Sequence, residues 1–327
     1  IGEQIAMLFT TIYGNISLAG KLKLVNVWFP KKYVQGFKGP KFGIGGVRKI
    51  LGVYDRPLIC NMIKPCTGFP PEVGAKYAYE AARGGVDIIK DDELLANARF
   101  NTVEDRIVKY MEAIDRANEE KGEKTLYCIN ITDDIPQVFE NADKVIELGA
   151  NCIMINYLAA GFGVLRKLAE DLSIKVPIMG HMDVTGAFVN SPFSGVSAPI
   201  IMGKLPRLCG IDIEVYPAPY GKALFMKEKY LAIADALRYP FYHIKPTFPM
   251  PSGGIMQRFV PEIIQDLGID VVIGVGGAIH AHPMGPAAGA RAFRQAIDAV
   301  LKYGYTNLKK FVKEHKAPEL EAALKAW

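Results

Sequence analysis

The sequence has few cysteines, no long apolar run and no strong excess of charge, and each absence removes a class of protein. No stretch of about 18 consecutive apolar residues occurs, so the sequence predicts no membrane-spanning helix. The net charge is +5, and no basic run is interleaved with aromatic residues, so we expect neither a nucleic-acid partner nor a membrane partner. The first residues lack the basic, apolar and cleavage pattern of a leader segment.

The five cysteines are scattered along the chain, and none forms a Cys-x-x-Cys pair. A disulfide scaffold or a zinc site of common spacing is therefore not predicted. Three of the five lie in apolar, strand-like runs, which is typical of reduced thiols in a protein core. We expect a cytoplasmic protein.

Short apolar runs alternate with longer amphipathic stretches along most of the chain, which is typical of strands alternating with helices. The apolar runs predict strands at residues 58–63, 86–89, 126–131, 152–157, 176–180, 209–215, 244–250 and 270–275. The amphipathic stretches predict helices at residues 72–83, 103–119, 135–148, 162–172, 222–238, 257–267 and 286–302, with a weak candidate at 194–207. This pattern predicts an α/β protein with a (β/α)8 TIM barrel, and a doubly wound sheet is the alternative.

Residues that could take part in catalysis or ligand binding lie where the predicted strands end. They are Lys64, the stretch from Lys90 to Glu93, Asn130, Asn156, His181, Ser252, Gly276 and Gly277. Barrel active sites form at the C-terminal ends of the strands, so this placement favours the barrel over the doubly wound sheet.

The most informative of these stretches is an apolar run that ends abruptly in Lys90, Asp91, Asp92 and Glu93. Three acids and a lysine at a buried strand end require ion pairing, a bound cation or both. Neighbouring strand residues point to opposite faces, so Lys90 and Asp92 share one side. Oxygen ligands of this kind suit Mg²⁺, and a solvated strand end with ion pairs is the alternative.

Residues 84–93, Gly-Gly-Val-Asp-Ile-Ile-Lys-Asp-Asp-Glu, resemble the metal-binding signature of the RuBisCO large subunit and of the RuBisCO-like proteins. The resemblance implies that CO₂ carbamylates Lys90. It further implies that the carbamate, Asp92 and Glu93 hold Mg²⁺.

Lys64 follows the first predicted strand and would face the same mouth. Nearby positive charge and burial would lower its pKa and suit it to proton transfer, although it could instead be a counter-ion for Asp91. It matches the proton-transferring lysine of the family's Ile-Lys-Pro-Lys motif. The second lysine of that motif is Cys66 here.

Two glycine turns follow the seventh and eighth predicted strands, at Ser252-Gly253-Gly254 and Gly276-Gly277. Glycine lets the backbone approach an anion, and barrels commonly bind phosphate at this place. The family, by resemblance, holds a substrate phosphate there.

His181 ends the fifth predicted strand and is either an ordinary hydrogen-bonding residue or part of the site. The resemblance implies a histidine beside the metal, but the usual neighbouring arginine is Met182 here. Lys222 matches the lysine of the family's mobile sixth loop and could equally lie on a helix surface. Two prolines in that loop and Val215, where carboxylases keep a histidine, depart from the carboxylase pattern.

Residues 1–57 do not fit the repeat and are expected to be an irregular lead-in from a truncated N-terminal domain. Residues 58–305 are expected to form the barrel, and residues 306–327 a C-terminal helical tail. By resemblance, Asn15 reaches the active site of a partner subunit, which implies a homodimer or higher homo-oligomer.

Together these features predict a RuBisCO-like, Mg²⁺-dependent enzyme that enolises or isomerises a phosphorylated ketose. A methylthio-substituted pentulose phosphate of methionine salvage is the kind of substrate that the resemblance implies. One alternative is a genuine ribulose-1,5-bisphosphate carboxylase. The other is a non-catalytic sugar-phosphate-binding or scaffold protein.

Overall fold

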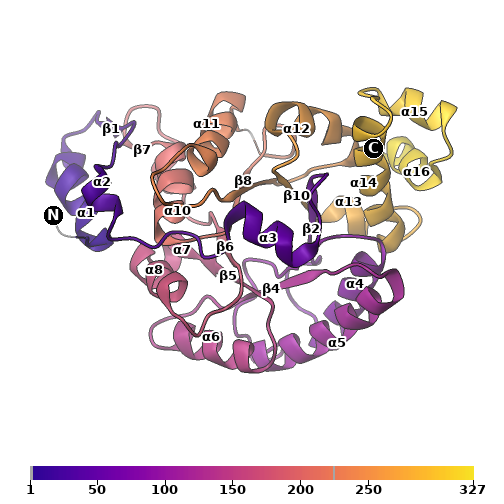
Figure 1. The fold of residues 1–327 in the computed structure, drawn as a ribbon, viewed down its shortest axis with the longest axis horizontal. Coiled ribbons are helices and arrows are strands. Elements are labelled where there is room, and N and C mark those ends of the chain that lie inside the picture. The colour runs from indigo at the N-terminus through magenta and orange to yellow at the C-terminus, as the bar shows by residue number, and fades with distance from the viewer. Residues whose placement is uncertain (1–2, 224) are drawn as a thin grey trace.

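The computed structural model describes residues 3–223 and 225–327, and its centre is a barrel of parallel strands surrounded by helices (Figure 1). The strands follow the order β10-β2-β3-β4-β5-β6-β8-β9. Their bounds are β2 (Leu58–Met62), β3 (Ile88–Lys90), β4 (Leu126–Asn130), β5 (Cys152–Asn156), β6 (Ile178–His181), β8 (Ile213–Pro217), β9 (Phe248–Ser252) and β10 (Val272–Val275). The predicted barrel is confirmed.

Most predicted helices are present within a few residues of the expected bounds. They are α4 (Pro71–Arg83), α5 (Val103–Lys121), α6 (Gln137–Glu147), α8 (Phe162–Glu170), α11 (Lys227–Arg238), α12 (Val260–Leu267) and α14 (Pro286–Leu301). The weak candidate at 194–207 is instead a short strand, β7 (Gly195–Val196), a π-helical turn, η2 (Ile200–Lys204), and α10 (Leu205–Cys209).

Strands β8 and β9 each begin four residues later than expected, for identifiable reasons. Helix α10 continues through Cys209 and ends at Gly210, whose φ of 110° is readily adopted only by glycine, so β8 starts at Ile213. The segment before β9 is held out of the sheet because the Arg207 guanidinium binds the carbonyls of Ile244 and Lys245.

The barrel closes between β9 and β10 without a hydrogen-bonded ladder. The Phe248 N–H donates to Asp212 O on the β8 side, so the alternate residues Pro249 and Pro251 turn their nitrogens toward β10. Proline has no N–H, so the donors for a ladder to β10 are missing. The two strands nevertheless touch, since a Cβ placed on Gly274 would lie 3.0 Å from Pro251 O.

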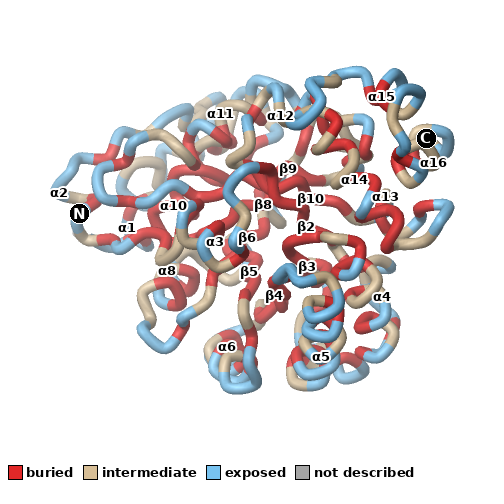
Figure 2. The backbone as a smooth tube through the Cα atoms, turned by 45° about the vertical axis from the view of Figure 1, so that its right-hand side comes forward, coloured by how far each residue is buried: buried red, intermediate tan, exposed pale blue. Residues whose placement is uncertain are grey.

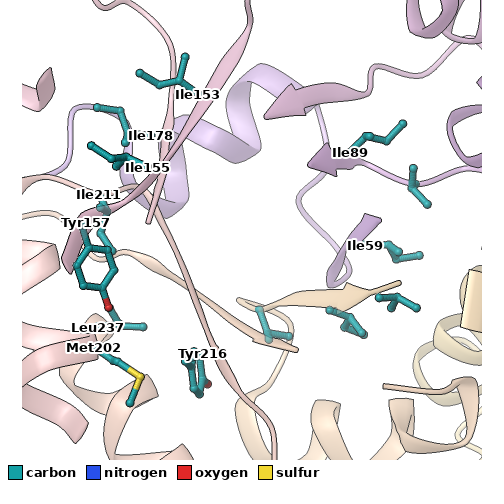
Figure 3. Packing of buried hydrophobic residues seen from close by; sticks show 14 of the residues in the cluster. Ile59, Ile89, Ile153, Ile155, Tyr157, Ile178, Met202, Ile211, Tyr216 and Leu237 are labelled. Atoms are coloured by element: carbon teal, nitrogen blue, oxygen red, sulfur yellow. The ribbon is translucent and has the colours of Figure 1, made fainter. Parts of the chain in front are cut away.

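Side chains alternate between the barrel interior and the layer beneath the helices. Buried residues concentrate on the strands, and exposed residues on the outer helices (Figure 2). Ile59, Ile89 and Ile153 belong to the large outer cluster, part of which Figure 3 shows. Cys128 and Cys152 face the interior and are paired as a disulfide between β4 and β5, so the expectation of reduced thiols is wrong for this pair.

The prediction that the lead-in is irregular is wrong. It contains α1 (Ile5–Tyr13), the 3-10 turn η1 (Asn15–Leu18), β1 (Lys23–Leu24), α2 (Lys31–Val34) and α3 (Gly43–Leu51), and β1 pairs with β7. Ile44, Val47 and Leu51 of α3 pack on the interior barrel residues. Helix α3 therefore closes the N-terminal end of the barrel, at the opposite end from the predicted site.

The C-terminal part continues as α15 (Leu308–Glu314) and α16 (Pro318–Ala326). Helix α16 packs against α14, where Arg291 Nε contacts Glu319 Oε1 at 3.0 Å. Among the described residues, no helix is both long and apolar enough to cross a membrane.

Candidate active site

A cavity of about 480 Å³ opens at the C-terminal ends of the barrel strands. Nine of the residues predicted from the sequence line it: Lys64, Glu93, His181, Lys222, Ser252, Gly253, Gly254, Gly276 and Gly277. Lys90 and Asp92 are not lining residues, but each contacts one: Lys90 contacts Glu93, and Asp92 contacts Lys64. The rest of the lining is mostly apolar: Met62, Met182, Pro217, Ala223, Ile255, Met256, Ala278, Ala281 and Trp327.

The pleat of β3 sends its terminal acids in opposite directions. Asp91 points away from the cavity, where its carboxylate accepts from Arg106 Nε at 2.9 Å and from the Tyr127 hydroxyl at 2.6 Å. Asp92 points the other way and pairs with Lys64 at 2.5 Å. Asp91 is therefore a structural acid, and the expected alternative of a Lys64–Asp91 pair is not what the structure shows.

Lys90 is fully buried at the end of β3. Its ammonium donates to the Asp91 carbonyl at 2.6 Å and lies 3.4 Å from Glu93 Oε2. The amides of Asn130 and Asn156, at the ends of β4 and β5, donate to the Glu93 carbonyl at 3.2 and 3.1 Å. These contacts fix the turn that carries Glu93 back over the strand end. Burial alone would raise the pKa of Glu93, but the charges of Lys90 and His181 lower it overall.

The expectation that the pKa of Lys64 is lowered is wrong for the structure as it stands. Burial lowers this pKa, but the hydrogen bonds to Asp92 and to the Cys66 thiol, 3.0 Å away, raise it further than burial lowers it. The prediction failed because it counted neighbouring cations and overlooked the acid that Lys64 directly contacts.

His181 ends β6 and is 3 % exposed. Its Nε2 lies 3.4 Å from Glu93 Oε2, and its Nδ1 lies 3.4 Å from Asp183 Oδ1. Glu93, His181 and Asp183 thus offer ligand atoms within 4.8 Å of one another. Asp183 was not predicted as a site residue, although its position two residues after a histidine at a strand end could have indicated that it lies at the same site.

The two glycine turns form one wall of the cavity. Gly253 and Gly254 have φ of 95° and 84°, which residues with a Cβ rarely adopt. Among the described residues, neither backbone N–H has an acceptor within the protein. Gly277 begins the short helix α13 (Gly277–His280), and a Cβ placed on it would meet no atom within 4 Å. Free N–H groups beside open space are the arrangement that an anion requires.

The segment after β8 lies against the first glycine turn. The Lys222 N–H donates to Gly253 O at 2.9 Å, and Lys222 is an exposed residue at the cavity. Tyr220 stacks on Phe259, with ring centroids 5.9 Å apart, and its hydroxyl bonds Asp266 of α12. These contacts anchor the loop. Asn15 is exposed in η1 and is not among the cavity residues of its own chain.

The donor set fits a hard cation. Glu93, His181 and Asp183 offer ligand atoms within 4.8 Å of one another, Asp92 lies beside Glu93 in the chain, and the buried Lys90 contacts Glu93 where a carbamate would supply a further oxygen. The ammoniums of Lys64 and Lys90 pair with Asp92 and Glu93 and hold these two carboxylates in place.

This architecture places the protein among the (β/α)8-barrel proteins that build their functional site at the C-terminal ends of the strands. The family model of the ribulose bisphosphate carboxylase large chain, catalytic domain, matches residues 43–327. The chain therefore belongs to the RuBisCO large-chain family.

Its relatives by sequence include a RuBisCO-like protein and enolases. The chain is 66% identical over 324 residues to a ribulose bisphosphate carboxylase-like protein of Archaeoglobus fulgidus, covering 99% of this chain and 74% of that one. It is 41% identical to a 2,3-diketo-5-methylthiopentyl-1-phosphate enolase of Bacillus licheniformis, covering 99% and 79%.

Similar solved structures include a rubisco-like protein and a Rubisco. A rubisco-like protein (MtnW) of Alicyclobacillus acidocaldarius superposes with a TM-score of 0.94 at 38% identity, covering 100% of this chain and 81% of that one. A dimeric archaeal Rubisco of Hyperthermus butylicus superposes with a TM-score of 0.91 at 36% identity, covering 100% and 79%.

Proposed function

We propose that the protein is a metal-dependent enolase acting on a phosphorylated ketone, of the kind named for the Bacillus relative. The observation that carries this proposal is the position of Lys64. It lines the cavity beside the second glycine turn, where a Cβ placed on Gly276 would lie 3.4 Å from Lys64 Cε, and it contacts the acid Asp92. A base that lies between a phosphate site and a cation site can remove a proton from the carbon that joins the phosphate ester to the carbonyl group.

The cation would be Mg²⁺, held by Asp92, Glu93 and a carbamate on Lys90. When bound, it would polarise the substrate carbonyl and stabilise the negative charge that enolisation places on the oxygen. A cation bound to the Asp92 carboxylate would weaken the ion pair between Asp92 and the Lys64 ammonium. Once Asp92 serves as a ligand, the desolvation of Lys64 would lower its pKa and make the neutral amine accessible.

The enolisation moves one proton and conserves atoms. Lys64 accepts the proton from the carbon next to the carbonyl, the C–H electron pair forms the C=C bond, and the carbonyl oxygen becomes an enolate. The proton then passes to the enolate oxygen, which yields the enol. Gly253, Gly254 and Gly277 would hold the phosphate during these steps.

The cavity lining favours a monophosphate with an apolar tail over a bisphosphate. Met182 stands where the resemblance implies an arginine for a second phosphate, and Met62, Met256 and Trp327 also line the cavity. Thioether and aromatic side chains suit an apolar methylthio group. This feature supports a salvage substrate over ribulose bisphosphate, although Lys222 at the cavity keeps the carboxylase as the second candidate.

The test is hydrogen exchange in D₂O with 2,3-diketo-5-methylthiopentyl-1-phosphate, Mg²⁺ and bicarbonate, followed by proton NMR. We expect loss of the signal of the carbon-bound proton with the wild type and with Lys76→Met, an exposed control on α4. Lys64→Met should be slower by about 10²–10⁴-fold. A parallel assay supplies ribulose bisphosphate and labelled bicarbonate.

Incorporation of label into acid-stable product would replace the proposal with the carboxylase. Neither exchange nor incorporation, with phosphate esters still bound, would leave the non-catalytic alternative.

A further inference from the structure

His181 is held between two carboxylates that face different ring nitrogens. Nε2 faces Glu93 Oε2 and the cavity, and Nδ1 faces Asp183 Oδ1, each at 3.4 Å. The Nδ1 atom is buried and forms no hydrogen bond within the described part of the chain. A buried imidazole nitrogen without a partner is costly, so this atom requires a partner when the site is in its working geometry.

Asp183 is the acid that is available to Nδ1. Glu93 Oε2 already faces the buried ammonium of Lys90 at 3.4 Å. Among the described residues, the one hydrogen bond to the Asp183 carboxylate is a long contact of 3.5 Å from the Asn156 amide to Oδ2, so Oδ1 can accept. A small rotation of a side chain that is 31% exposed would bring Oδ1 within hydrogen-bond distance of Nδ1.

The backbone holds Asp183 in place below the histidine. Residues 182–185 form a turn that is closed by the Thr185 N–H donating to Met182 O at 3.1 Å. Val184 occupies the third position of this turn with a φ of 70°, which is unfavourable for a β-branched residue. The turn is therefore kept against local preference, and it places the carboxylate two residues after the histidine on the same side.

We propose that Asp183 is a positioning residue that accepts a hydrogen bond from His181 Nδ1–H and leaves the Nε2 lone pair facing the cavity. The second nitrogen of a histidine sets which ring atom is free to act, and a carboxylate partner also fixes the plane of the ring. His181 can then accept a proton or hydrogen bond from a substrate group that lies beside Glu93. The turnover measurement below rests on the proposed function, whereas the test of the hydrogen bond between Asp183 and His181 does not.

The first measurement needs no substrate. The chain has five histidines, so ¹⁵N-detected imidazole spectra are simple, and His181→Gln identifies the signal. At about pH 8.5, where an ordinary imidazole is neutral, we expect the Nδ1–H tautomer in the wild type. Asp183→Ala should shift His181 toward the Nε2–H tautomer. The control Asp134→Ala, which removes an exposed acid from the neighbouring strand-end loop, should not.

The second measurement is turnover. Asp183→Ala should lower kcat by about 10- to 100-fold with KM unchanged, and Asp183→Asn, whose Oδ1 still accepts from Nδ1–H, should recover part of the loss. An Nε2–H tautomer in the wild type, an unchanged tautomer in Asp183→Ala, or an effect on KM alone would overturn the proposal. If the tautomer shifts as expected but the wild type turns over no ketone phosphate, the proposed function fails and the role of Asp183 stands.

Discussion

The division of labour between Asp91 and Asp92 gives the sharpest test of the site, because the two acids are adjacent but face different surroundings. The Asp91 carboxylate accepts from Arg106 Nε and the Asn130 N–H, both at 2.9 Å, and from the Tyr127 hydroxyl. The Arg106 and Asp91 side chains are both 0% exposed. Asp91→Asn would remove the charge that balances Arg106 and turn an N–H toward one of these donors.

The magnitude follows from this burial. Breaking a buried ion pair by removing one partner costs about 3–5 kcal/mol. Unfolding entropy of about 2.1 cal/mol/K per residue gives roughly 0.7 kcal/mol/K for a chain of this length. The melting temperature of Asp91→Asn should therefore fall by about 6 °C. Within the described part of the chain, the Asp92 side chain contacts the partly exposed Lys64 and the Leu94 N–H. The melting temperature of Asp92→Asn should therefore change little while its activity is lost.

Differential scanning calorimetry and the exchange assay on both variants check this prediction. The folded fraction of Asp91→Asn should keep measurable exchange. An Asp91→Asn protein as stable as the wild type, or an Asp92→Asn protein that is equally destabilised, would refute the assignment of structural and functional roles.

Four further predictions concern the cation site, the phosphate site and the assembly. ¹³C-bicarbonate with Mg²⁺ should give a carbamate NMR signal that Lys90→Arg lacks, and its absence at high Mg²⁺ would contradict the proposed ligand set. Gly277→Val should weaken binding of a phosphate ester, measured by calorimetry, because its side chain would enter open cavity space, whereas Gly163→Val on the exposed face of α8 should not. Leu18 is 86% exposed, so light scattering should give at least a dimer for the wild type and a smaller species for Leu18→Glu. Asn15→Ala should lower kcat and leave the melting temperature unchanged, and an active monomer would contradict both interface predictions.

The strand ends could be predicted from the sequence because each signal was local. Lys90, Asn130, Asn156, His181 and Ser252 each lie within two residues of the end of an apolar run, and each is the last residue of its strand in the structure. Parallel strands bring such residues to one face whatever their separation in the chain. The opposite orientations of Asp91 and Asp92 likewise followed from the pleat alone.

The lead-in could not be predicted in the same way because its helices depend on tertiary contacts. Helix α3 carries three glycines in nine residues, which is unfavourable for an isolated helix. Ile44, Val47 and Leu51 nevertheless have helical spacing, and their burial against the barrel offsets the poor propensity. The Asp212 carboxylate also accepts from the N–H groups of Phe42 and Gly43, at 2.8 and 2.7 Å, a partnership about 170 residues apart in sequence.

The ion-pair partners of the charged residues could not be predicted from the sequence either, and these partners bear on how a cation would bind. Each acid of the β3 end has its own cation: Asp91 has Arg106, Asp92 has Lys64, and Glu93 has Lys90. Carbamylation would turn Lys90 from a positive into a negative group inside a fully buried position, which strongly disfavours the carbamate unless positive charge arrives with it. A divalent cation would supply that charge and would also withdraw Asp92 from Lys64. Under the proposed function, these ion pairs would therefore couple three events, namely carbamate formation, cation binding and release of the Lys64 amine for proton transfer.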